Sequence, residues 1–469
     1  MSEPAPFFPL FPQEATGPVM TPDEPAPDEP APEAPVAVVP GPPAFTPLPP
    51  GAIIAHRGGA LHAPEHTLDA YRIAAAHGIP VIEADAVTLA DGTLGVMHDG
   101  TVDRTTTSSG NVADHTAASW RQLVIDAGVQ LGGGWGDHRP PLLDDVLAEF
   151  AGRIPLTIEA KTGGTTMTAL CDALDRYRVP PDAVLLQSFS RADCVTAVAR
   201  GRPVAWLGTT DVPAAAASGI PWVAPFFPAA TGELCAAVHA AGLKVAAWTV
   251  NRRFQRDALR AAGVDAIFSD DPAYLHSDAI RRRSDLFARG VWLPGHQTNT
   301  GNRGRFHPDG SWGYDLDGGR ADFTLHGALG PTDPAAFTLD LAVRVDAVND
   351  GDATRWPSLY LSGTDHAWAD GPLPGAHGYH LLARANGVLA VYRITDGGNT
   401  LLAQDVAGPP LPPGGWVPLR VTVDRHGIRL ERRDTGGAVT AADAAHRPLP
   451  FLTLGRNGAG VRFREVVFS

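Results

Sequence analysis

The chain has 469 residues and a formal net charge of -14, and only two of its 37 basic residues are lysine. This length exceeds one ordinary hydrophobic core and predicts at least two domains. The acidic balance, without a basic cluster, argues against a nucleic-acid-binding protein, and no apolar run reaches the roughly 18 residues of a membrane span.

Residues 1–50 are rich in proline and acidic residues and contain no lysine or arginine. Such a segment cannot bury enough apolar surface to offset the entropy lost on ordering, so we expect a disordered leader. The start has neither the basic residues nor the apolar stretch of a secretory signal, which favours a cytoplasmic protein unless the true start lies elsewhere. The three cysteines are odd in number, and we expect small buried hydrophobes in a reduced compartment at Cys171, Cys194 and Cys235.

After the leader, strand-like and helix-like segments alternate. The apolar run 53–55 predicts a buried strand that ends at His56 and Arg57, followed by two glycines. Thr67 is expected to cap the next helix, whose apolar side would carry Leu68, Tyr71, Ile73 and Ala75.

The strand predicted at residues 81–85 carries Glu83 and Asp85. Side chains two positions apart on a strand point to the same face. An apolar arm at residues 94–97 then ends in His98 and Asp99. Charged side chains are rarely buried without a partner or a metal, so two acids in phase on an apolar strand indicate chemistry more strongly than a solvated strand.

Further strands are predicted at 155–159, 184–188, 204–207, 222–224, 244–250 and 264–269, separated by helices at 166–177, 192–200, 231–241 and 254–262. Continuous apolar strands between amphipathic helices predict a parallel sheet with both faces covered. Eight such units in about 220 residues predict a closed (β/α)8 barrel, whose active site lies where the strands end. Residues at such ends are His56, Glu83, Asp85, Glu159, Lys161 and Trp248.

Several short motifs occur in a fixed order: His56-Arg57-Gly58, Pro64-Glu65-His66-Thr67, Glu83-Ala84-Asp85, Asp91-Gly92 and His98-Asp99. Together they resemble the signature of the glycerophosphodiester phosphodiesterases, a TIM-barrel family. The segment beginning at Trp248 resembles another family motif. His66 departs from the pattern, because the family usually has asparagine there, and this leaves the hydrogen bonds around Glu65 open.

The resemblance implies hydrolysis of glycerophosphodiesters to glycerol 3-phosphate and an alcohol, and a small-molecule substrate. It assigns proton transfer to His56 and His98, without deciding which is acid and which is base. It also implies that a neighbouring glycerol hydroxyl attacks first, through a cyclic phosphate.

The residue types predict how charge is handled at the site. Three hard carboxylates without cysteine, at Glu83, Asp85 and Glu159, suit Mg²⁺ or Ca²⁺ better than zinc. Arg57 would fork onto a phosphate oxygen, and Lys161 would supply a compact second cation. Trp248 would complete the substrate site.

From about residue 286 the pattern changes to alternating strands, as at 337–345, 417–423 and 461–463, with glycine turns between them. This predicts an antiparallel β-sandwich, similar to the concanavalin/laminin-G class of jelly rolls. Trp312, Trp356 and Trp368 either stack on a glycan or polymer surface or pack in the core. The predicted organisation is a leader at 1–50, a barrel at 51–285 and a sandwich at 286–469.

Two other functions stay open at this point. Phospholipase D-like enzymes acting on lysolipids or sphingolipids share the barrel, but normally use disulfide-stabilised loops and a secretion signal. A surface- or glycan-binding protein with a decayed barrel is the non-enzyme alternative. The intact set of charged residues at the strand ends argues against decay.

Overall fold

The structure is a computed structural model that describes residues 48–469, with gaps at 62, 128–130, 132–134, 136, 162–166, 279–280, 283–303, 317–320, 327–328, 331–332, 366–375, 397 and 444. Residues 1–47 of the predicted leader therefore lie outside the described residues.

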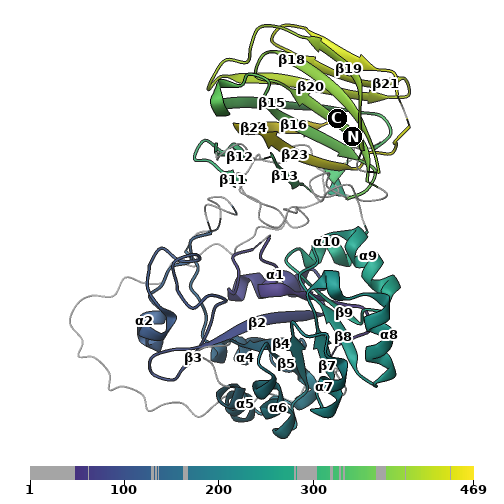
Figure 1. The fold of residues 1–469 in the computed structure, drawn as a ribbon. Helices are drawn as coiled ribbons and strands as arrows, with labels where there is room; N and C mark the ends of the chain where they lie inside the picture. Colours follow the sequence, from purple (N-terminus) through teal and green to yellow (C-terminus); the bar gives the residue numbers. More distant parts are fainter. Residues whose placement is uncertain are drawn as a thin grey trace, which may run out of the picture. The chain divides into compact units, whose positions relative to one another are not determined.

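Eight parallel strands form the predicted barrel (Figure 1). The ring closes because β1 pairs with both β9 and β2. A ninth strand, β3 (Leu94–Val96), runs antiparallel to β2 as the predicted arm. The barrel strands are β1 (Ala52–Ala55), β2 (Val81–Thr88), β4 (Leu156–Ala160), β5 (Val184–Ser188), β6 (Val204–Leu207), β7 (Trp222–Ala224), β8 (Lys244–Ala247) and β9 (Ala266–Ser269).

The helices lie outside the ring of strands (Figure 1). They are α1 (Leu68–Ala76), α2 (Ala117–Trp120), α4 (Leu143–Phe150), α5 (Met167–Arg176), α6 (Arg191–Ala199), α7 (Val212–Ala217), α8 (Gly232–Ala240), α9 (Arg253–Ala262) and α10 (Pro272–His276). Thr67 caps α1 as predicted, since its hydroxyl accepts the backbone N–H of Ala70. The predicted buried face of α1 was partly wrong: Ala75 is exposed, and the helix buries Ala70, Tyr71 and Ala74.

Strand register sets the geometry of the site. Asp85 on β2 lies opposite Glu159 on β4, and Ala55 on β1 lies opposite Ser269 on β9. Because parallel strands in a closed barrel end at one rim, residues that follow β1, β4 and β9 meet Glu83 and Asp85, which precede the point where β2 leaves its pairing with β4 at Ala86. The barrel thus gathers charged residues that are up to 214 positions apart in the chain.

Gly58 lies in the turn after β1 and is packed beneath α1. It has φ +82°, and a Cβ atom there would lie 2.8 Å from Ala70 Cβ and 2.9 Å from Tyr71 Cδ1. We expect Gly58→Ala to lower the free energy of unfolding by about 2–4 kcal/mol, from backbone strain plus overpacking. Gly78→Ala is the control, because it shares a positive φ of +73° but has nothing within 4 Å; urea unfolding that gave equal losses would contradict the packing argument.

The C-terminal part is all β, as predicted. One sheet contains β11 (Arg305–Phe306), β12 (Trp312–Tyr314), β24 (Ala459–Phe468), β15 (Phe337–Val348), β20 (Trp416–Asp424), β21 (Gly427–Arg432) and β22 (Ala438–Ala441), in that order. The other contains β13 (Ala321–Leu325), β23 (Phe451–Asn457), β16 (Trp356–Ser362), β17 (His377–Ala383), β18 (Val388–Thr395) and β19 (Gly398–Val406). A short parallel pair joins β10 (Arg281–Arg282) to β14 (Leu329–Gly330).

The sandwich tryptophans left open whether they stack on a ligand or pack in the core, and they differ in burial. Trp312 is fully buried and packs edge-on against Tyr314, so the core interpretation is right for it. Trp356 is half-buried, and Trp368 lies outside the described residues. The likeness to concanavalin-type domains stays a prediction.

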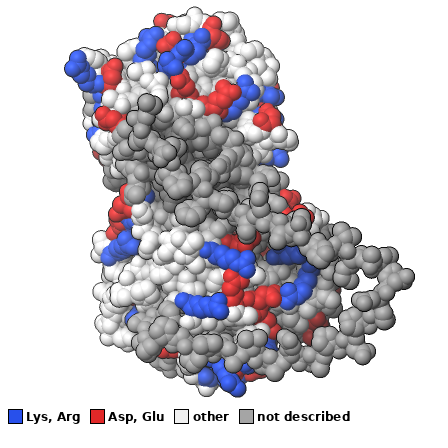
Figure 2. Space-filling model, turned by 180° about the vertical axis from the view of Figure 1, so that it is seen from behind, with Lys and Arg blue, Asp and Glu red and all other residues white. Residues whose placement is uncertain are grey.

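Among the described residues, no helix is both long and apolar enough to cross a membrane. On the face shown in Figure 2, Lys and Arg side chains are interspersed with Asp and Glu side chains, and among the described atoms neither sign forms a continuous field. All three cysteines are free and buried in the barrel.

Candidate active site

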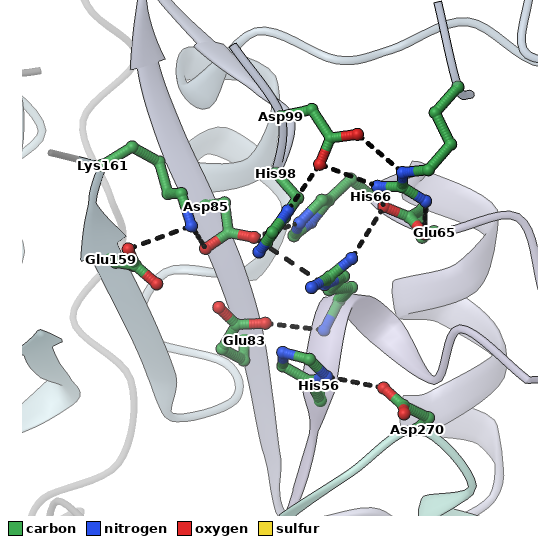
Figure 3. A network of polar contacts seen from close by, with 12 residues as sticks. His56, Glu65, His66, Glu83, Asp85, His98, Asp99, Glu159, Lys161 and Asp270 are labelled. Atoms are coloured by element: carbon green, nitrogen blue, oxygen red, sulfur yellow. Dashed lines mark hydrogen bonds and ion pairs between the residues drawn. The ribbon is translucent and has the colours of Figure 1, made fainter. Parts of the chain in front are cut away.

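A cavity of about 90 Å³ opens at the carboxyl ends of the barrel strands. Charged side chains line one part of it and aromatic side chains another. Figure 3 shows how the charged residues from different strands converge there. The lining residues are His56, Arg57, Glu83, His98, Glu159, Gln187, Phe189, Leu207, Trp248, Thr249 and Phe268.

His56 directly follows β1 and is held by a carboxylate from the far end of the barrel sequence. Its Nδ1 lies 2.6 Å from Oδ1 of Asp270, and the Nδ2 group of Asn251 donates to Oδ2 of Asp270 at 2.9 Å. Burial would raise the pKa of Asp270, but the charge of His56 and the two hydrogen bonds outweigh it and lower the pKa. An ionised Asp270 therefore holds Nδ1–H and leaves Nε2 of His56 to exchange a proton.

His98 also lines the cavity and is held by a carboxylate in a similar way. Its Nδ1 lies 2.6 Å from Asp99, and Arg104 donates to Asp99 at 2.6 Å and to both oxygens of Glu65 at 2.7 and 2.8 Å. Glu65 also pairs with Arg57 at 3.3 Å. Burial would raise the pKa of Glu65, but Arg104 and Arg57 lower it to about 2. One network of alternating charges thus joins Arg57 to His98.

Three buried carboxylates face one another beside these histidines. Oε2 of Glu83 accepts the backbone N–H of Arg57 at 2.6 Å, and Oε1 accepts from Gln187 at 3.2 Å. Burial, together with the charge of Asp85, raises the pKa of Glu83 well above its ordinary value and that of Glu159 to about 8. Both carboxyl groups therefore bind a proton more readily than an ordinary glutamate, and a positive charge beside them would favour their ionised form.

The donor set fits a hard divalent cation. Glu83, Asp85 and Glu159 are 1%, 1% and 6% exposed, and their oxygens are the ligand type that Mg²⁺ and Ca²⁺ use. The donor atoms of His66, Glu83 and Asp85 lie within 4.8 Å of one another, close enough to hold a metal ion. A cation there would offset the negative charge that the carboxylates concentrate.

Lys161 follows β4 and points back to these acids. Its Nζ lies 3.0 Å from Glu159 and 3.7 Å from Asp85 Oδ1. Burial would lower the pKa of Lys161, but the two carboxylates raise it, so the side chain is a cation at the rim of the cavity.

We expect Lys161→Arg to fold normally and to lose about tenfold in turnover, roughly 1.4 kcal/mol, because the longer, forked guanidinium does not fit a site built for a point charge. Lys244→Arg is the matched control: Lys244 begins β8, is exposed, and sits over the Trp222 ring at 5.2 Å. Steady-state kinetics in which the two variants behaved alike would contradict this role for Lys161.

The aromatic wall of the cavity is centred on Trp248. Its indole N–H donates to the carbonyl of Ala224 at 2.7 Å, and its ring lies 5.7 Å from Phe189 and 5.5 Å from Phe226. Phe189 and Phe226 are 44% and 51% exposed. Fixed aromatic rings beside a charged cavity suit a ligand that is ionic at one end and uncharged at the other.

The eight residues predicted from the sequence lie in or beside this one cavity. The sequence reasoning missed Asp270, Asn251, Gln187 and the role of Arg104. Asp270 carried a usable signal: it directly follows the last strand, which must lie beside the first strand in a closed barrel. Gln187 at the end of β5 carried the same signal, but an isolated glutamine has no motif around it.

An eight-stranded parallel barrel whose rim holds two carboxylate-bound histidines, an arginine and three buried acids defines an enzyme of the (β/α)8 class. A model of the glycerophosphoryl diester phosphodiesterase family matches residues 56–274. The chain belongs to this family, as its motifs predicted.

Individual relatives agree with the family match. A glycerophosphodiester phosphodiesterase of Caldanaerobacter subterraneus subsp. tengcongensis is 31% identical over 240 residues, covering 48% of this chain and 95% of that protein. One from Bacillus subtilis is 29% identical over 252 residues, covering 48% and 84%.

Two solved structures are similar to the chain over about half its length. A glycerophosphodiester phosphodiesterase from Agrobacterium tumefaciens is 24% identical with a TM-score of 0.42, covering 48% of this chain and 99% of that chain. An Oleispira antarctica phosphodiesterase, solved in complex with the product sn-glycerol-3-phosphate, is 24% identical with a TM-score of 0.41, covering 48% and 95%.

Proposed function

We propose that this protein hydrolyses glycerophosphodiesters to glycerol 3-phosphate and an alcohol, and that it needs Mg²⁺ or Ca²⁺. The observation that carries the proposal is the placement of three buried carboxylates, an arginine and two carboxylate-held histidines around one cavity. The substrate class follows from the names of the relatives at about 30% identity.

In the overall reaction, the phosphorus–oxygen bond to the alcohol breaks and a bond to an oxygen from water forms. One histidine takes a proton from the attacking oxygen through Nε2, while the other gives one to the departing alkoxide. Asp270 and Asp99 keep each ring in the tautomer that exposes Nε2 and stabilise the ring when it is charged.

Arg57 would bind the phosphoryl group in this proposal. Its backbone N–H is held by Glu83 and its guanidinium by Glu65, so the side chain is fixed before the substrate arrives. Glu83, Asp85 and Glu159 would hold the cation, with Lys161 beside them. When bound, the cation supplies electrostatic stabilisation of charge on the phosphoryl oxygens.

Product analysis tests this function against the phospholipase D-like alternative. The purified full-length protein is incubated with glycerophosphocholine, glycerophosphoethanolamine and lysophosphatidylcholine, each with divalent cation, and the products are identified by phosphorus NMR. We expect glycerol 3-phosphate from the first two substrates. Turnover of the lysolipid alone would favour the alternative, and no turnover of any diester would refute the proposal.

A further inference from the structure

A buried chain of three side chains runs behind the proposed cation site. The Tyr71 hydroxyl lies 2.9 Å from Nδ1 of His66, and Nε2 of His66 lies 2.8 Å from Oδ2 of Asp85. All three residues are buried, with exposures of 0%, 3% and 1%. His66 belongs to the Pro64-Glu65-His66-Thr67 motif before α1, and the proposed mechanism gives it no role.

The hydrogen bonds determine where the ring proton lies. An ionised carboxylate only accepts hydrogen bonds, so Nε2 of His66 must carry the proton that faces Asp85. In the neutral ring, Nδ1 is then an acceptor, and the Tyr71 hydroxyl donates to it. Asp85 therefore selects the tautomer of His66, and the Tyr71 hydroxyl stabilises it by donating to Nδ1.

The hydrogen bond from His66 makes the two oxygens of Asp85 inequivalent. Oδ2 is taken by His66, whereas Oδ1 lies toward Lys161, at 3.7 Å from its Nζ. A carboxylate held through one oxygen cannot rotate freely, so Oδ1 is kept on the side where Glu159 also lies. The arrangement is that of a ligand whose orientation is set by a second residue.

The backbone explains which residues fit at this position. His66 has φ +55°, in the left-handed region that asparagine and histidine tolerate better than most residues. An asparagine would thus keep the turn, but its shorter side chain does not span the distance between Asp85 and Tyr71. The imidazole of His66 satisfies both the turn and the bridge.

We propose that His66 is a positioning residue of the cation site, which holds Asp85 as a ligand through one oxygen, with the Tyr71 hydroxyl stabilising the tautomer that donates to Asp85. The inference rests on the proposed cation dependence. Residues that orient metal ligands typically contribute about 10–100-fold to metal affinity. We expect a loss of that size in His66→Asn, and a smaller loss of about three- to tenfold in Tyr71→Phe, which removes only the hydroxyl.

Mn²⁺ binding to the full-length protein, followed by the EPR signal of free Mn²⁺, tests the inference without substrate. His66→Asn and Tyr71→Phe are compared with wild type, after thermal unfolding without cation has shown that each variant is folded. His138→Asn is the matched control, because His138 also pairs with an acid, Asp69 at 3.1 Å, but away from the cavity. Weaker binding in the first two variants and unchanged binding in the third support the proposal.

Two results would overturn the inference and leave the proposed function standing. Equal Mn²⁺ affinity in wild type, His66→Asn and Tyr71→Phe would show that the bridge does not position Asp85. A nitrogen coupling in pulsed EPR of bound Mn²⁺ that disappears in His66→Asn would make His66 a direct ligand instead. If wild type itself bound no divalent cation, the cation requirement of the proposed function would be wrong, and the inference would fail with it. In the first two results wild type binds Mn²⁺, so failure of the inference and failure of the proposed function are distinguishable.

Discussion

Removal of divalent cations is expected to lower turnover of glycerophosphodiesters by about a thousandfold or more. Glu83 and Glu159 are buried and their pKa values are raised, because burial and the charge of Asp85 disfavour a second negative charge. Without a cation the cavity loses its main source of positive charge for the phosphoryl group, a contribution of several kcal/mol. Dialysis against EDTA, followed by kinetics with graded Mg²⁺ or Ca²⁺, measures the effect.

Two controls make this result specific to the carboxylates. Glu159→Gln removes one charged donor and should raise the cation concentration needed for half-maximal activity, whereas Glu149→Gln, on the exposed pair with Arg72, should not. Full activity in excess EDTA after exhaustive dialysis would rule out a cation-dependent mechanism.

The second large effect is expected from Asp270→Asn, which should lower kcat by about a hundredfold or more. The substitution preserves the size of the side chain but removes the charge that holds Nδ1–H of His56 at 2.6 Å. His56 would then lose its preferred tautomer and the stabilisation of its charged form, a loss within the range of about 10²–10⁴ that general acid–base groups contribute.

The chain supplies a matched control for that substitution in a second histidine–aspartate pair. His239 and Asp265 lie 2.9 Å apart, at the side of the barrel where β9 begins rather than at the rim that holds the cavity. Asp265→Asn should leave kcat within about twofold of wild type, because neither residue lines the cavity. Similar losses in both variants would mean that Asp270 supports the fold rather than His56, and unfolding curves would show this directly.

Local patterns in the sequence determined the framework of the barrel and most of the charged residues. Glu83 and Asp85 were recognised because side chains alternate between the two faces of a strand. Two acids two positions apart therefore had to point to the same face of an otherwise apolar strand. His56, Glu159 and Lys161 were recognised because parallel strands of a barrel end at one rim. These inferences need only periodicity and strand direction, which a sequence carries.

The role of His66 shows where local pattern stops. The motif placed His66 next to Glu65 in the sequence. In the structure, the backbone of His66 is in the left-handed region, and its ring contacts Asp85 and Tyr71. Trp312 is a similar case, since an alternating strand alone does not tell which face meets the other sheet, and packing buried it. Such choices depend on neighbours from other elements.

Asp270 is the residue that the sequence reasoning missed and the tertiary structure placed beside His56. It is 214 residues from His56 in the chain, and no motif surrounds it. Closure of the barrel brings β9 beside β1, with Ser269 opposite Ala55. Asp270 follows Ser269 and His56 follows Ala55, so these two residues meet just beyond the ends of the two strands. The sequence therefore determined the motif residues that we propose for the chemistry, whereas closure of the barrel decided which carboxylate contacts His56, because contacts between distant strands depend on register and not on local order.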